Sequence, residues 1–114
     1  MELITEDMLT YSWNITSVDV INWNGHTDIV RKVYYTFTGE YMDFENIINK
    51  KAILNLQRLE AAEPIEFSDL TQEIVVGWLQ EHLLEEVKNS YKTECAVKIT
   101  EMIYPTYINK TLPA

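Results

Sequence analysis

The sequence predicts an α+β domain in which an antiparallel β-hairpin and a third strand come first and one or two amphipathic helices follow. Apolar residues alternate in the first part of the chain, an Asn-Gly dipeptide interrupts the alternation, and helical spacing takes over in the second half. The 114 residues suit a single domain. We place it at residues 11–104, after a short leader of residues 1–10 and before an extended tail of residues 105–114.

The hairpin is predicted over residues 11–38. Its first strand alternates up to Ile15 and then slips by one place before Val18, as a β-bulge would make it do. The Asn-Gly dipeptide follows, and both residues tolerate the positive φ angles of a tight hairpin turn. The second strand, from Thr27 to Thr38, is rich in the β-branched and aromatic residues that favour strands.

Residues 40–66 are open to two interpretations. The alternation from Ala52 to Leu56 indicates a third strand, which we place at residues 51–59. The same region also has a composition that suits a helix. Pro64 disfavours helix immediately before it, so the residues around it form a connector.

The best-defined element begins at Thr71, whose hydroxyl suits the N-cap of a helix. Apolar residues then recur at helical spacing in two stripes. The first stripe holds Leu70, Ile74, Val75, Trp78, Leu79 and Leu83, and the second holds Val87, Tyr91, Cys95, Ile99, Met102 and Ile103. Glu85-Glu86 either separates two helices or marks a bend in one long helix, and Pro105 ends the helical region.

The charge balance limits the partners. Nine Lys and Arg face eighteen Asp and Glu, which gives a net charge of −9. Binding to nucleic acids and to anionic membranes depends on clustered Lys and Arg, so we expect neither partner. No stretch of the sequence has the roughly 20 apolar residues of a membrane span. The simplest role for the acidity is solubility.

The sequence shows no pattern of catalytic or ligand-binding residues. His26 and His82 are the only histidines, and neither has a partner at zinc-binding spacing. The serines lack a nucleophile motif, the three glycines form no phosphate-binding loop, and the acidic residues from Glu60 to Glu73 lack the order of a calcium loop. Cys95, the single cysteine, cannot form an internal disulfide. We therefore expect no catalytic residue, no metal site and no cofactor, and a protein that is not an enzyme.

Aromatic side chains are the candidates for a binding surface. They crowd the first part of the chain, and both faces of the second strand carry rings or branched residues. One face must pack under the helix, and the other either binds a partner or belongs to a core on both sides of the sheet. The candidate partner interface consists of Tyr34, Tyr35, Tyr41, Phe44, Tyr104 and Tyr107.

Four motifs carry a resemblance to a known family. They are Tyr11-Ser12-Trp13, Thr36-Phe37-Thr38-Gly39, the helix start Leu70-Thr71-Gln72-Glu73 with Trp78 after it, and Leu112-Pro113. In this order they resemble a family of short, uncharacterised bacteriophage proteins common in marine cyanophages, and the resemblance covers most of residues 11–114. Members often end in Pro-Trp, whereas this chain ends in Pro113-Ala114. Residues 1–10 and 40–50 are also longer than the family pattern.

The resemblance implies a phage origin and carries no activity that can be transferred. It predicts a virion structural or accessory protein, such as a capsid decoration, head–tail or tail component. Such a protein binds other phage structural proteins, as a homo-oligomer or in many copies. Its expected location is the virion, assembled in the host cytoplasm. The alternative is a small acidic effector that binds and inhibits a host protein in the host cytoplasm.

Overall fold

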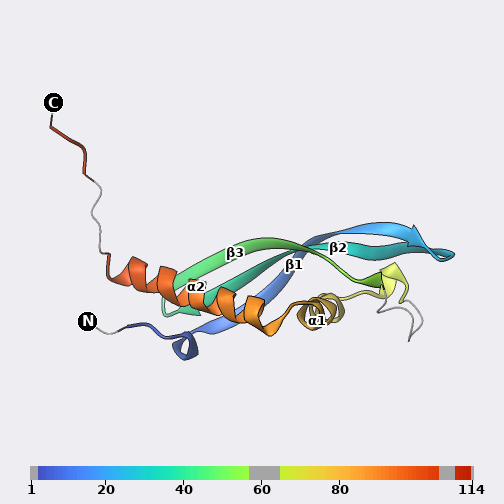
Figure 1. Cartoon of the computed structure of the whole chain (residues 1–114), viewed down its shortest axis with the longest axis horizontal. Coiled ribbons are helices and arrows are strands. Elements are labelled where there is room, and N and C mark those ends of the chain that lie inside the picture. The colour runs from blue at the N-terminus through green and yellow to red at the C-terminus, as the bar shows by residue number, and fades with distance from the viewer. Residues whose placement is uncertain (1–2, 57–64, 106–109, 114) are drawn as a thin grey trace.

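The computed structural model describes residues 3–56, 65–105 and 110–113. Its order is three strands followed by two α-helices, so the fold is α+β, as the sequence predicts (Figure 1). Two short 3-10 helices, η1 (Glu6–Met8) and η3 (Phe67–Asp69), precede the sheet and the first α-helix. No helix in these ranges is long and apolar enough to cross a lipid bilayer.

The first two strands form the predicted hairpin. β1 (Thr10–Trp23) pairs antiparallel with β2 (His26–Tyr41). Asn24 and Gly25 connect them with φ angles of 52° and 81°, in the left-handed region that this turn requires. The strand pairing shifts by one residue just after Ile15, which confirms the predicted β-bulge.

The third strand lies earlier in the chain than predicted. β3 runs over Phe44–Ile53, whereas the sequence placed it at residues 51–59, of which 57–59 lie outside the described residues. It begins early because a turn at Met42 and Asp43 follows β2 directly, with Met42 at a φ angle of 54°. Gly, Asn and Asp usually take this conformation, so a methionine at position 42 does not indicate a turn in the sequence. β3 pairs with β2, and β2 is the central strand.

Two helices follow the sheet. The sequence left open whether this region forms two helices or one long bent helix, and the structure has two. α1 spans Gln72–His82 and α2 spans Glu85–Ile103. The Thr71 side chain accepts a hydrogen bond from the backbone N–H of Ile74 at 3.2 Å, so the predicted N-cap is confirmed. The break falls at Leu83 and Leu84, whose backbones are extended, immediately before the predicted separator.

The core lies between one face of the sheet and the helices (Figure 1). Its buried members from the strands are Ile15, Val30, Val33, Tyr35, Phe37 and Ile48, and those from the helices are Val75, Leu79, Tyr91, Cys95 and Ile99. Met102 does not join them, because its side chain is 45% exposed. Ile4 and Leu9 do join them, so the packed core begins before residue 11, inside the segment interpreted as a leader.

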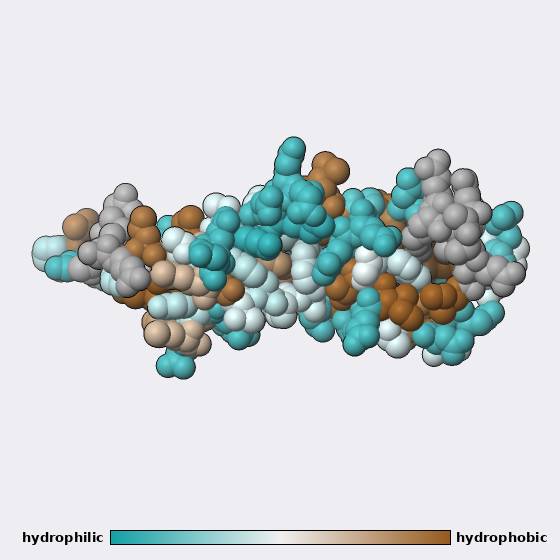
Figure 2. Space-filling view, turned by 90° about the horizontal axis from the view of Figure 1, so that it is seen from below, coloured by the Kyte–Doolittle hydropathy of each residue, from teal (hydrophilic) through white to brown (hydrophobic). Residues whose placement is uncertain are grey.

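The other face of the sheet is mostly polar, with Ile47 as an exposed apolar residue on it. Its rows of paired residues include Ser12 with Thr38, Asn14 with Thr36, and Thr36 with Asn49. Figure 2 shows a different side of the molecule, seen from below, where hydrophilic side chains cover the middle and hydrophobic ones gather in separate patches toward the two ends. The molecule thus has one covered face, one polar face and apolar surface near its ends.

Candidate interaction site

The neighbouring tyrosines of β2 point to opposite faces of the sheet. Tyr34 lies on the polar face, where its hydroxyl donates a hydrogen bond to Asp19 Oδ2 at 2.8 Å. This hydrogen bond raises the pKa of the Tyr34 hydroxyl. Tyr35 lies in the core and is 2% exposed. This corrects its place in the predicted interface, because a side chain buried under α2 cannot contact a partner.

The remaining predicted residues are spread along the chain. Tyr41 and Phe44 flank the turn between β2 and β3 and pack, half-buried, against the core. Tyr104 follows α2 and is 36% exposed. Tyr107 lies outside the described residues. Since Tyr34 and Tyr35 already point to opposite faces of the sheet, the six residues do not form one surface.

Tyr35 instead connects the sheet to α2 inside the core. Its hydroxyl oxygen lies 2.7 Å from that of Tyr91 in α2, and the two share a buried hydrogen bond. The rings of Trp13 and Phe37 pack edge to face with their centres 4.8 Å apart, and the Phe37 ring lies 5.6 Å from that of Tyr91. Burial, with the Tyr91 hydrogen bond second, raises the pKa of Tyr35. The pair is therefore structural.

A glycine brings the middle of α2 close to the sheet. A Cβ atom on Gly39 would lie 2.7 Å from Cys95 Cβ and 2.9 Å from Cys95 Sγ, closer than such atoms approach. Burial raises the pKa of the Cys95 thiol. A buried thiol with a raised pKa is protonated at neutral pH and is a poor nucleophile. Cys95 is thus a packing residue.

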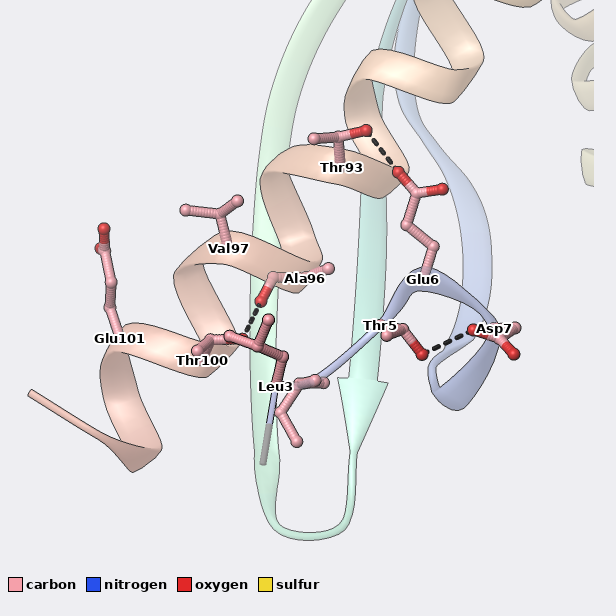
Figure 3. A pocket seen from close by; sticks show the side chains of 10 residues that line it. Leu3, Thr5, Glu6, Asp7, Thr93, Ala96, Val97, Thr100 and Glu101 are labelled. Carbon is pink, nitrogen blue, oxygen red and sulfur yellow. Dashed lines mark hydrogen bonds between the residues drawn. The ribbon is translucent and has the colours of Figure 1, made fainter. Parts of the chain in front are cut away.

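A groove that the sequence did not indicate lies between the N-terminal segment and α2 (Figure 3). Its volume is about 660 Å³. One wall is residues 3–7, which lead into η1. The other is one face of α2, formed by Thr93, Ala96, Val97, Thr100 and Glu101. Because these residues recur three and four places apart, they share a face of the helix.

The groove combines apolar walls with an acidic rim. Leu3 and Val97 are 64% and 49% exposed, so both present apolar surface to solvent. Glu6, Asp7 and Glu101 contribute carboxylates, and no Lys or Arg is among the described lining residues. Glu101 already forms an ion pair with Lys98 at 3.9 Å, so Glu6 and Asp7 carry the negative charge that faces a partner. The arrangement suits an apolar group that has a positive charge beside it.

Two hydrogen bonds hold the acidic rim in place. The Thr93 hydroxyl donates to a carboxylate oxygen of Glu6, which joins the two walls (Figure 3). The Thr5 hydroxyl donates to Asp7 Oδ1 at 2.6 Å, and this bond lowers the pKa of the Asp7 carboxyl. The first bond thus fixes the position of the Glu6 carboxylate, and the second favours the charged form of Asp7.

Sequence reasoning missed this groove for two reasons. The face of α2 that lines it mixes small, polar and charged residues, so it forms no apolar stripe. The opposite wall belongs to the segment interpreted as a leader. Ile4 and Leu9, apolar residues in that polar segment, are the signal that could have shown it packing against the domain.

The described residues contain no group of three or more His, Cys, Asp or Glu that could hold a metal ion. His26 begins β2, His82 ends α1, and both are exposed. Their separate positions place them in no common site.

Comparison with known proteins gives one match. The model of the family described as "Domain of unknown function (DUF7936)" matches residues 8–113. No curated protein and no solved structure matches the chain. The family match includes all three strands and both α-helices.

Proposed function

We propose that this chain, which belongs to the DUF7936 family, is a bacteriophage virion structural or accessory protein that acts through protein–protein contacts. The observation that carries the proposal is the groove between the N-terminal segment and α2. Exposed apolar surface with a polar rim is typical of protein interaction sites. The resemblance to short phage proteins supplies the setting, a particle in which many protein surfaces meet.

The chemistry of the groove defines the partner. Its apolar walls bind an apolar side chain, and Glu6 and Asp7 attract a Lys or Arg next to it. The net charge of −9 reinforces this preference over longer range. The partner is therefore a segment of another structural protein that presents an apolar residue flanked by a basic one.

The test begins with purified particles of the phage that encodes this chain. Mass spectrometry should detect the chain in a constant ratio to the major capsid protein. Changing Val97→Arg fills the groove with a bulky cation that repels the basic partner, so incorporation should fall roughly tenfold, as for loss of one central interface contact. Met102→Arg is the matched control, because Met102 lies on α2, is 45% exposed and does not line the groove.

Absence of the chain from purified virions would overturn the proposal. A chain that is absent from virions but retains one stoichiometric host protein would favour the effector alternative. Equal incorporation of the Val97→Arg and Met102→Arg variants would show that the groove is not the contact, even if the chain is a virion component.

A further inference from the structure

The two outer edges of the sheet differ. The edge of β1 is partly covered by the side chain of Gln72 at the start of α1. Gln72 Oε1 accepts a hydrogen bond from the backbone N–H of Ile15 at 2.9 Å, and Gln72 Nε2 donates to the Ile15 carbonyl at 2.7 Å. The amide thereby takes the place of a neighbouring strand at this position.

The edge of β3 is not paired with any described strand. β3 pairs with β2 without a bulge over its whole length. Just beyond it, Leu54 directs its N–H at β2 and donates to the Arg31 carbonyl at 2.8 Å. Backbone groups in an antiparallel ladder alternate between the two sides of a strand. The residues that direct their N–H and C=O groups at the outer edge are therefore Glu45, Ile47, Asn49, Lys51 and Ile53.

We propose that the outer edge of β3 pairs antiparallel with β3 of a second copy of this chain, around a two-fold axis at Ile48. Two antiparallel copies of one strand meet in a register defined by its central residue. With Ile48 at the centre, Glu45 of each copy lies opposite Lys51 of the other. Both side chains are exposed, and neither forms an ion pair within the described residues.

The charge pairs select this register. Centring on Asn49 instead would set Glu45 opposite Ile53 and Lys51 opposite Ile47, with no opposite charges facing each other. Centring on Ile48 also sets Ile48 against its own copy on the helix-covered face. Opposite charges and matched apolar residues are the cross-strand pairs that stabilise antiparallel sheets.

Lysines on an edge strand often prevent pairing, because a charge that meets no partner keeps another strand away. Lys51 differs in having a complementary carboxylate on the same edge. α2 packs on both β2 and β3, at Gly39 and at Asn46, so in the dimer the two α2 helices lie beside each other on the same face of the sheet. The product is a continuous six-stranded sheet with the helices of both copies on one face.

Sedimentation equilibrium on the full chain tests the pairing, which does not depend on where the protein acts. The unaltered chain should be a dimer that dissociates on dilution. Lys51→Glu sets carboxylates opposite each other at two places and should weaken dimerisation roughly tenfold. The double change Glu45→Lys with Lys51→Glu exchanges the charges and should restore the dimer. Lys50→Glu is the matched control, because it alters charge equally but lies opposite Asn46.

A second variant tests the backbone contact. Asn49→Pro removes an N–H group from the outer edge and leaves the β2 pairing intact, so it should abolish the dimer while circular dichroism retains the monomer's spectrum. A monomeric unaltered chain would overturn the proposal. So would a dimer that Lys51→Glu weakens no more than Lys50→Glu does, or a charge exchange that fails to restore pairing.

Discussion

Individual contacts between α2 and the sheet set the spacing of the two layers. Gly39 leaves room for Cys95, and the hydroxyls of Tyr35 and Tyr91 meet in the core. The first contact requires that residue 39 has no side chain. The second requires that the two buried hydroxyl groups form a hydrogen bond with each other. Both are sensitive to the removal or addition of a few atoms, because protein interiors are close-packed.

Gly39→Ala should destabilise the fold by about 1–3 kcal/mol, because the new methyl group would overlap Cys95. Gly77→Ala is the matched control. A Cβ atom at Gly77 would meet no atom within 4 Å, and alanine favours helix, so this change should stabilise the protein by about 1 kcal/mol. Urea unfolding of both variants measures the two free energies. Equal effects at the two glycines would contradict the packing of α2 described above.

The tyrosine pair should make stability depend on alkaline pH. The folded state raises the pKa of Tyr35 above its ordinary value of 10.0, so it favours the neutral hydroxyl. This contribution is complete below pH 10 and is lost as the pH rises above it, because the unfolded state then releases its proton first. Tyr11, whose pKa burial raises to about 12, acts in the same direction.

The free energy of unfolding of the unaltered protein should therefore decrease as the pH is raised from neutral to above 10. The fall should be smaller in the Tyr35→Phe, Tyr91→Phe double variant. Tyr91→Phe alone leaves the Tyr35 hydroxyl without its buried partner and should cost about 1–3 kcal/mol at neutral pH. If the single and double variants lost the same stability, the two hydroxyls would not be coupled.

At the scale of elements, α1 does more than cover the core. Gln72 links its first turn to the edge of β1 through two hydrogen bonds. Thr71, the residue before it, caps the same turn. The start of α1 is thus fixed both by its own cap and by the strand beside it.

Gln72→Ala should destabilise the fold by about 1–2 kcal/mol, because both hydrogen bonds to Ile15 are lost at a partly buried position. Glu73→Ala, at the neighbouring exposed position, should change stability by less than about 0.5 kcal/mol. Thermal or urea unfolding compares the two variants. Faster hydrogen exchange at the Ile15 amide in the Gln72→Ala variant would locate the effect at the strand edge.

The elements that local signals define were predicted correctly. Asn24-Gly25 defines the hairpin, and Thr71 with the apolar stripe after it defines the start of the helices. β3 was misplaced because its turn uses Met42, a residue that adopts positive φ only where strand pairing imposes it. Neighbouring residues of a strand point to opposite faces of the sheet, so the sequence separates Tyr34 from Tyr35. This alternation does not say which of the two faces the helices cover.

The groove could not be predicted because its walls are far apart in the chain. The bond between Glu6 and Thr93 connects positions separated by 87 residues. No periodicity within either segment reports such a contact. The candidate interface failed as one surface for a related reason: the six aromatic residues share a chemical type but not a location.

At the scale of the whole molecule, the two proposed surfaces are separate. No residue lining the groove belongs to β3 in the described part of the chain. A dimer formed through β3 would therefore present two grooves related by a two-fold axis. Two linked grooves bind a multi-copy partner more tightly than either does alone, provided that their spacing matches the partner's. A particle built from repeated subunits offers such a partner.

The packing of Ile4 and Leu9 against the domain has a consequence for folding. These residues are synthesised before α2, because the whole sheet and α1 lie between them and α2 in the chain. The core therefore cannot close until α2 has been made. Contacts between such distant segments slow folding because the long intervening loop must first be ordered. The β-hairpin can form early, but Ile4 and Leu9 stay exposed to solvent until α2 packs against them.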